Sequence, residues 1–302
     1  MLIMSFFLPS LSMSFDNIMV FLYNINMVNK MSTKYVISLD LDSTLLDDKK
    51  EISDETVKYF KKLTNDGHTI LLNSGRPYQG TIRFLKRLGL DSPVIFSDGA
   101  GIAWFDKNYQ VNKKILFSIS RDAVLDIYKE NEEKIVGINI VEFNNQYFND
   151  KRVIPSWMFH EGEHIVLHEG AIDKILNTDP ITITCVILKD GLDKFLKSMD
   201  KWKDEVEYFS WGEFDNAVAF EIFKKGVNKG STLLYLCDLL GLDKNNIIAM
   251  GDNMNDLSMI KVAGIGCAMI NGSESLKKQA KYITKYDCNN DGVRRFLEKI
   301  IK

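Results

Sequence analysis

The chain has 302 residues, of which 45% are hydrophobic and 26% are charged, so it is long enough for one large or two moderate globular domains. Its formal net charge of −3 gives no support for a nucleic-acid-binding surface. The four cysteines, Cys185, Cys237, Cys267 and Cys288, form no C-x-x-C pair, which favours isolated thiols in a reducing, cytoplasmic compartment over a disulfide framework.

Residues 1–30 differ in composition from the rest of the chain. They hold five of the twelve methionines, and Asp16 and Lys30 are their only charged side chains. A secretory signal would begin with a basic segment, and Pro9 and Asp16 interrupt the apolar run that a membrane span requires. We therefore expect no membrane association, and a leader that is disordered or lies upstream of a translation start at Met31.

The first predicted element is a strand over residues 35–39, an apolar and partly β-branched run typical of a strand buried on both faces of a parallel sheet. Asp40 and Asp42 follow it directly. Ligands of open α/β sheets bind beyond the carboxyl ends of the strands, so these acids are well placed for chemistry. Asp-rich turns after strands are also common structural features, and the pair alone leaves both interpretations open.

A helix that begins after Ser53 is predicted next, since Ser53 is suited to cap it. The second strand, residues 69–72, leads into Ser74, Gly75 and Arg76. A hydroxyl beside a flexible backbone amide suits phosphate oxygens, although the same residues also make a good turn. Arg76 is able to pair with a phosphate or with a neighbouring acid, and the sequence does not decide between them.

Two further apolar runs end in the same way. Residues 94–96 lead into Asp98, and residues 247–250 lead into Asp252 and Asp256. With helical segments between them, the four runs predict an α/β fold with one parallel sheet, whose polar rim gathers on a single edge as one shared site. Carboxylates packed there would repel one another unless they shared a cation, and oxygen-only ligands favour Mg²⁺.

Residues 117–220 differ in pattern from the predicted sheet. Within them, residues 192–202 carry apolar side chains at helical spacing, and residues 181–188 and 206–211 are predicted strands. We therefore expect an inserted second domain with a core of its own. A lid of this kind would exclude water and strengthen the electrostatic interactions beneath it.

The insert also contains the pattern His160-Glu161-Gly162-Glu163-His164, followed by His168. H-E-x-x-H binds catalytic zinc when it lies on a helix. The glycine inside a weakly periodic segment argues against a helix, so we expect a solvated or substrate-facing segment instead.

Lys229 stands just before a predicted helix with Leu233, Leu236 and Leu240 on one face, so its charge lies at a helix end that disfavours cations. An anion should therefore accompany it, either a substrate phosphate or the aspartates that follow the first strand. The alternative is a surface lysine whose long stem carries the charge into water.

Four short motifs occur in a fixed order along the chain. They are Asp40-x-Asp42-x-Thr44, Ser74-Gly75-Arg76, Gly226-Val227-Asn228-Lys229-Gly230 and Gly251-Asp252-x-x-Asn255-Asp256. Together they resemble the motifs of the haloacid dehalogenase superfamily. The wide gap between the second and third motifs, and the ending Asn290-Asp291-Gly292-Val293, are similar to its Cof-type branch of sugar and small-metabolite phosphatases. The resemblance implies a Rossmann-like core, residues 31–116 and 221–302, with an inserted α/β cap, residues 117–220, that selects the substrate.

The resemblance also implies a Mg²⁺-dependent phosphatase of small phosphorylated metabolites. Asp40 would attack phosphorus to give an aspartyl phosphate, and Asp42 would protonate the leaving oxygen and later deprotonate the attacking water. The remaining roles are phosphate binding by Ser74, Gly75, Lys229 and Asn255, metal binding by Asp40, the backbone carbonyl of Asp42, and Asp252, and loop orientation by Asp256. Asp42 must be protonated at one step and ionised at the next. A neighbouring carboxylate or a closed cap is able to raise its pKa enough for that, and the sequence does not show whether either does.

Three residues depart from the usual pattern of the resembling family. Ser74 stands where threonine is commoner, Ser43 stands where glycine is frequent, and Asp98 stands where the Cof branch has asparagine. A charge at Asp98 would repel an anionic substrate or bind a hydroxyl, so the substrate stays open, as does the oligomeric state. The alternative functions are a phosphotransferase or phosphomutase with the same nucleophile, and a non-enzymatic module that binds a phosphorylated metabolite.

Overall fold

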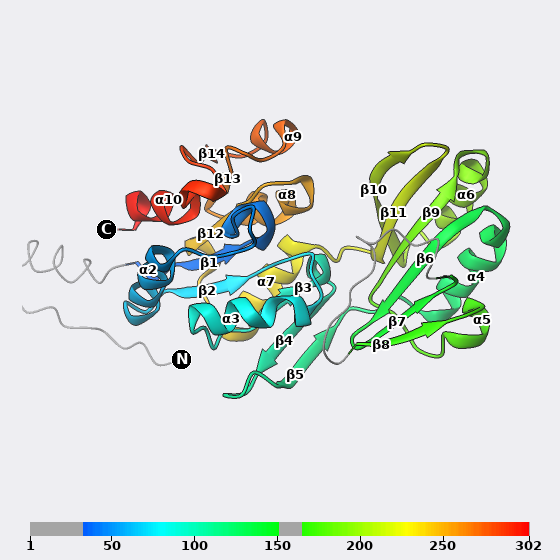
Figure 1. Ribbon diagram of the computed structural model, residues 1–302, viewed down its shortest axis with the longest axis horizontal. Coiled ribbons are helices and arrows are strands. Elements are labelled where there is room, and N and C mark those ends of the chain that lie inside the picture. Colours follow the sequence, from blue (N-terminus) through cyan, green and yellow to red (C-terminus); the bar gives the residue numbers. More distant parts are fainter. Residues whose placement is uncertain (1–32, 151–164, 302) are drawn as a thin grey trace, which may run out of the picture. The chain divides into compact units, whose positions relative to one another are not determined.

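The computed structural model describes residues 33–150 and 165–301, so the predicted leader and the pattern at residues 160–164 lie outside the described residues. Its centre is a parallel sheet with the strand order β14-β13-β12-β1-β2 (Figure 1). The strands are β1 (Val36–Leu39), β2 (Thr69–Leu72), β12 (Ile247–Gly251), β13 (Ile265–Ala268) and β14 (Tyr282–Ile283). The prediction of an α/β fold is confirmed.

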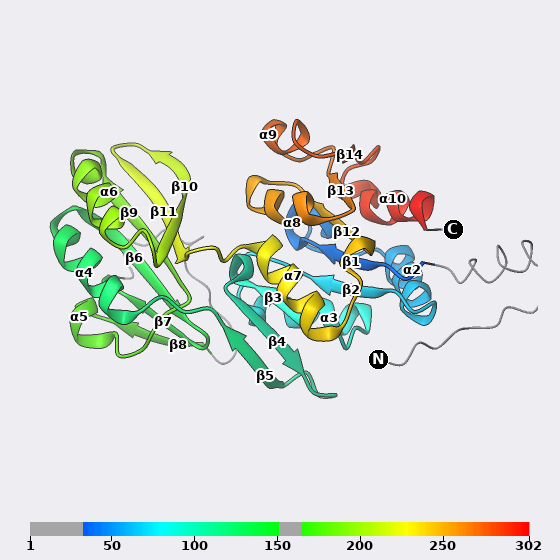
Figure 2. The same ribbon diagram turned by 180° about the vertical axis from the view of Figure 1, so that it is seen from behind.

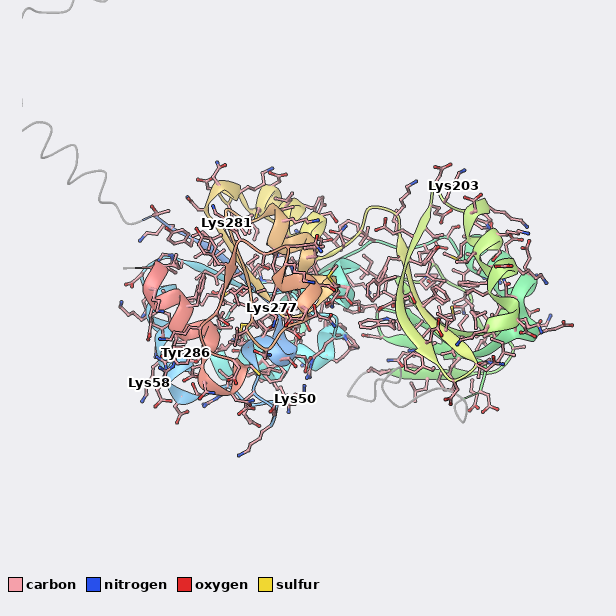
Figure 3. The ribbon with its side chains drawn as sticks, turned by 90° about the horizontal axis from the view of Figure 1, so that it is seen from above. Lys50, Lys58, Lys203, Lys277, Lys281 and Tyr286 are labelled. Atoms are coloured by element: carbon pink, nitrogen blue, oxygen red, sulfur yellow. The ribbon has the colours of Figure 1, made fainter. Side chains whose placement is uncertain are left out.

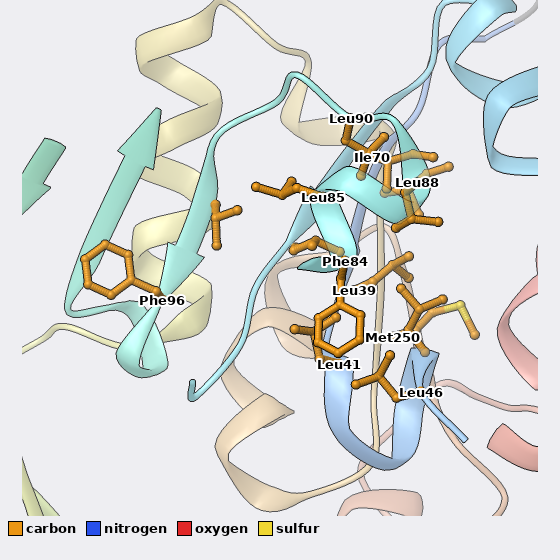
Figure 4. Close-up of a cluster of buried hydrophobic side chains, with 14 of the residues drawn as sticks. Leu39, Leu41, Leu46, Ile70, Phe84, Leu85, Leu88, Leu90, Phe96 and Met250 are labelled. Atoms are coloured by element: carbon orange, nitrogen blue, oxygen red, sulfur yellow. The ribbon is translucent and has the colours of Figure 1, made fainter. Parts of the chain in front are cut away.

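Helices cover both faces of this sheet, because its strands are apolar on both sides. Alternate residues such as Leu39 and Met250 pack with helices α2 (Asp54–Asn65), α3 (Ile82–Leu88) and α10 (Gly292–Ile300), and Figure 4 shows part of this cluster. Their neighbours pack with α7 (Lys229–Leu240) and α8 (Leu257–Val262), and α7 is seen in front of the sheet in Figure 2. The short helix α9 (Glu274–Lys277) packs through Leu276 in a smaller cluster.

The predicted cap of the first long helix is present, and α7 is capped at both ends. The Ser53 hydroxyl accepts a hydrogen bond from the Thr56 amide at the start of α2. Helix α7 begins after Asn228, whose side chain accepts from two backbone amides, and it ends at Gly241 in the left-handed conformation at φ 65°.

The assignment of residues 94–96 to the parallel sheet is only partly right. Strand β3 (Val94–Phe96) pairs antiparallel with β4 (Gly101–Phe105), which pairs with β5 (Val111–Leu116). A single parallel bridge, between Asn73 and Ile95, links this three-stranded sheet to the end of β2. The bridge and the Ser74 amide, which donates to the Ile95 carbonyl at 3.0 Å, still bring Asp98 to the predicted edge.

The inserted region forms a six-stranded sheet with the order β10-β11-β9-β6-β7-β8. Its strands are β6 (Ile135–Glu142), β7 (Asn145–Phe148), β8 (Val166–Glu169), β9 (Thr182–Leu188), β10 (Val206–Phe214) and β11 (Ala217–Lys224). Helices α4 (Arg121–Asn131), α5 (Ile172–Ile175) and α6 (Leu192–Lys201) bury one face of it in a separate hydrophobic cluster. Since β11 runs to Lys224, we propose that the cap extends to this residue rather than to residue 220.

Among the described residues, no helix combines the length and apolar character that crossing a bilayer requires. His168 lies on β8, where its ring stacks on Tyr147 at 4.6 Å between ring centroids and its Nε2 lies 2.9 Å from Asn145 Oδ1.

Candidate active site

The predicted site residues meet beyond the carboxyl ends of β1, β2 and β12. Asp40 follows β1 and is held by its amide, which donates to the Met250 carbonyl at 3.1 Å. Ser74 lies just past β2, and Asp252 lies just past β12. These residues line a cavity of about 380 Å³ together with Asp42, Gly75 and Asn255. The prediction that the strand ends share one edge therefore describes the geometry correctly.

Lys229 is fully buried beside Asp40 at this edge of the sheet, so it is not a surface lysine. Its Nζ donates to Asp256 Oδ1 at 2.6 Å and to Asp40 Oδ1 at 2.8 Å, and it lies 3.6 Å from Asp98 Oδ1. Burial opposes its charge, but these three carboxylates raise the pKa of Lys229 well above its ordinary value. Lys229 is therefore a fixed cation, and the aspartates are the anions that its position at the start of α7 requires.

Asp256 orients the loop that carries Asp252. Its Oδ2 accepts from the Asp252 amide at 2.9 Å and from the Asn253 amide at 3.1 Å, while its other oxygen binds Lys229. Gly251 makes room for it, because a Cβ there would lie 2.4 Å from the Asp256 carboxylate. Its carboxylate is fully engaged by these contacts, as expected of a residue that holds a loop in place.

The donor set at this edge fits a hard divalent cation. Carboxylate oxygens of Asp40, Asp252 and Asp256 all lie within 4.8 Å of one another. Oxygen donors of this kind suit Mg²⁺. Lys229 supplies one positive charge against these carboxylates and that of Asp98, which leaves an excess of negative charge for a cation to offset.

The pKa values of the acids reflect the same crowding. Burial, opposed by Lys229 and assisted by Asp256, raises the pKa of Asp40 well above its ordinary value. Burial and the nearby Asp256 carboxylate raise the pKa of Asp252 to about 6, although Lys229 and a hydrogen bond from Thr44 lower it. A bound cation would favour the ionised forms of both acids.

Asp42 lines the same cavity as Asp40 and Asp252, but two cations hold its carboxylate. Arg76 clamps it, with Nε donating to Oδ2 at 2.6 Å and Nη2 donating to Oδ1 at 2.7 Å, and Lys50 Nζ donates to Oδ1 at 2.8 Å. Burial raises the pKa of Asp42, but the hydrogen bonds from Arg76 and Lys50 outweigh it and lower the pKa to about 2. In this arrangement the pKa of Asp42 is lowered, not raised, and Arg76 pairs with an acid.

Three of the four predicted phosphate-binding residues line the same cavity, namely Ser74, Gly75 and Asn255, whereas Lys229 is buried behind Asp40 and is not part of the lining. Ser74 is buried, and its Oγ accepts from the Arg76 amide at 3.2 Å. A Cβ at Gly75 would lie 2.9 Å from Asp98 Oδ2, so a larger residue there would displace the Asp98 carboxylate. Asn255 Nδ2 donates to Asp98 Oδ1 at 2.9 Å, which gives the unusual Asp98 a structural partner.

Three residues of the cap sheet also line the cavity, and the sequence motifs did not identify them. They are Thr184 on β9, Trp211 on β10 and Glu221 on β11. Trp211 Nε1 donates to Glu221 Oε2 at 2.9 Å. Burial and the Asp98 carboxylate raise the pKa of Glu221 to about 8, despite this hydrogen bond and the charge of Lys229. A lone acid in the otherwise apolar β11 was the only signal for this group.

The chain matches known proteins over most of its length. The family model for haloacid dehalogenase-like hydrolases matches residues 37–297. The chain is 29% identical to a 5-amino-6-(5-phospho-D-ribitylamino)uracil phosphatase of Bacillus subtilis, YitU, over 89% of this chain and 98% of that protein. It is also 29% identical to a phosphoglycolate phosphatase of Methanobrevibacter smithii, over 88% and 97% of the two chains.

Solved structures agree with this assignment. The crystal structure of the Thermotoga maritima protein TM0651 superposes with a TM-score of 0.72 at 25% identity, over 89% of this chain and 98% of that one. A haloacid dehalogenase-like hydrolase of Bacteroides thetaiotaomicron shares the fold with a TM-score of 0.68 at 23% identity, over 89% and 100% of the chains. The predicted family and the predicted enzyme class, a phosphoric monoester hydrolase, are confirmed: the chain belongs to the haloacid dehalogenase-like hydrolases.

Proposed function

We propose that this hydrolase removes the phosphate group from a small phosphorylated metabolite, such as a sugar phosphate, through an aspartyl-phosphate intermediate and with Mg²⁺ as cofactor. The observation that carries the proposal is the buried Lys229 ammonium, bound to Asp40 beside a small polar cavity lined by Ser74 and Asn255. By their names, two relatives also act on small phosphorylated compounds. The four cysteines are buried and unpaired, which supports a cytoplasmic location.

Asp40 is the nucleophile of the proposed reaction. One oxygen of its carboxylate is held by Lys229, and the other attacks phosphorus as the bond from phosphorus to the leaving oxygen breaks. Lys229, the Ser74 hydroxyl, the Gly75 amide and Asn255 bind the other phosphate oxygens, whose charge must be stabilised in the transition state. Asp40, the backbone carbonyl of Asp42, and Asp252 would hold Mg²⁺, which when bound supplies further positive charge for these oxygens.

Asp42 is the proposed acid and base. It gives a proton to the leaving oxygen in the first step. In the second step it takes a proton from the water that attacks phosphorus, and the bond from phosphorus to the Asp40 oxygen breaks. With a pKa of about 2, Asp42 is ionised while Arg76 and Lys50 hold it. We therefore propose that substrate binding moves Asp42 out of this clamp, which would allow its pKa to rise.

The test is release of p-nitrophenol from p-nitrophenyl phosphate by the full chain, with Mg²⁺ or with EDTA, alongside Asp40→Asn. We expect activity that needs Mg²⁺ and that is lost in the variant. Activity that survives in Asp40→Asn would rule out Asp40 as the nucleophile. Folded protein without Mg²⁺-dependent activity would favour a strict phosphotransferase, which product analysis with an added sugar acceptor would detect, or a module that only binds its ligand.

A further inference from the structure

A second, larger cavity of about 1300 Å³ adjoins the active site and is strongly basic. Its charged lining consists of Lys50, Arg76, Arg83, Lys86, Lys113, Lys114 and one acid, Asp42. Lys50 and Arg76 are already paired with this acid. In the part of the chain that the structure describes, the other four cations make no ion pair. Lys113 and Lys114 are neighbours on β5, so their side chains point to opposite faces of the sheet, and the Lys113 ammonium lies over Trp104, which does not line the cavity. We call the other three residues, Arg83, Lys86 and Lys114, the basic cluster.

Aromatic rings hold the basic cluster in place. Lys114 Nζ lies 3.9 Å from the centre of the Phe143 ring, and Lys86 Nζ lies 5.5 Å from that of Tyr109. The Arg83 guanidinium is similarly placed over the ring of Phe84, at 4.5 Å. Such contacts fix a cation without neutralising it. Three cations around one cavity repel one another unless an anion enters, in a protein whose net charge is −3.

The position of the cavity indicates which anion it receives. Asp42 and Arg76 line both this cavity and the one over Asp40. In the proposed reaction Asp42 protonates the leaving oxygen, so the leaving group lies beside Asp42, where the two cavities meet. The distal part of the leaving group then has a direct way into the basic cavity.

We propose that the basic cluster binds a second anionic group, a phosphate or a carboxylate, carried by the leaving group of the substrate. This inference rests on the proposed phosphatase function and narrows its substrate class to metabolites with two anionic groups. Binding there also draws Lys50 and Arg76 toward a competing anion, which favours release of Asp42 from its clamp.

The test compares two inhibitors of p-nitrophenyl phosphate hydrolysis: butyl phosphate, and the same chain with a phosphate at both ends. We expect the bisphosphate to inhibit about tenfold more strongly, since its second phosphate gains charge-assisted contacts that the monophosphate lacks. The double variant Lys86→Ala/Lys114→Ala should lose this advantage, and added salt should reduce it. Both lysines are exposed, so the variant should fold.

A matched control is Lys58→Ala, which removes an exposed lysine on α2 that lies away from Lys50 in Figure 3. It should keep the bisphosphate advantage, and all three proteins should hydrolyse p-nitrophenyl phosphate equally. Equal inhibition by the two compounds in an active enzyme, or an advantage that survives in the double variant, would overturn the inference alone. Loss of Mg²⁺-dependent hydrolysis in wild type would instead overturn the proposed function.

The alternative occupant of the basic cavity is a free anion that is not part of the substrate. Succinate, added at fixed p-nitrophenyl phosphate, tests for it. If succinate changes KM in wild type but not in the double variant, while both alkyl phosphates inhibit equally, the cavity takes a free anion and the assignment to the substrate is wrong.

Discussion

Replacing Lys229 by methionine should strongly destabilise the protein. Methionine keeps most of the volume of a fully buried side chain but removes the ammonium that contacts Asp40 and Asp256 at 2.8 and 2.6 Å. Removing one partner of a buried ion pair costs roughly 3–5 kcal/mol, because the other charge stays buried without compensation. Here two carboxylates lose their partner, so we expect the free energy of unfolding at neutral pH to fall by at least that amount.

Urea denaturation in EDTA measures this change. Protonation relieves carboxylates that have lost their cation, so the loss in Lys229→Met should shrink as the pH is lowered toward 5. Adding Asp256→Asn removes one of the stranded charges, so the double variant should be more stable than the sum of the two single changes by about 0.5–3 kcal/mol.

The exposed Lys58→Met is the matched control, and it should change stability by less than about 0.5 kcal/mol. A loss below about 1 kcal/mol in Lys229→Met, or strict additivity with Asp256→Asn, would refute the view that Lys229 holds these acids together.

Two further predictions concern the active-site loop and the cap. Gly75→Ala should lower activity roughly 10–100-fold while the protein stays folded, because the new Cβ would lie 2.9 Å from Asp98 Oδ2 and displace the loop. Kinetics with p-nitrophenyl phosphate would measure the loss of activity, and a thermal melt would show that the variant is folded. Unchanged kinetics would contradict the prediction. The pKa of Glu221 is about 8 in the folded protein against an ordinary 4.5, so the folded state binds this proton more tightly and stability should decline as the pH rises through that window. Glu221→Gln should decline less over the same range in urea titrations, and an equal decline would mean that Glu221 does not titrate there.

The sequence predicted well that the polar residues which follow the parallel strands lie close together at one edge of the sheet. The residues after β1, β2 and β12 had to meet because parallel strands present their carboxyl ends at one edge, and Asp40, Ser74 and Asp252 do so. Lys229 also followed from local physics, since a cation at a helix start needs an anion. Its burial was not predictable, because it depends on the packing of α7 against the sheet.

Some residues have positions that could not be predicted from the sequence, because these positions depend on contacts between distant segments of the chain. The pairing of Asp42 with Arg76 and Lys50 joins segments that no spacing rule relates, and it lowers the pKa of Asp42 to about 2. Strand β3 looked like its parallel neighbours, yet it pairs with β4 through a turn in which Asp98 has a positive φ of 52°. Trp211 and Glu221 lie on cap strands whose register alone brings them to the cavity.

The insertion of the proposed cap at two points of the chain has a consequence for the evolution of substrate specificity. The insert enters after Leu116 and leaves after Lys224, and most of its hydrophobic cluster is separate from that of the core. Recombination at these two points would exchange the residues that we propose face the substrate and spare those that we propose bind its phosphate. Contacts with the core constrain such exchange. Among them, Phe143 stacks on Tyr78 at 4.3 Å between ring centroids, and the Tyr78 hydroxyl donates to Asn144 Oδ1 at 2.7 Å, so a foreign insert without these groups would lose both contacts.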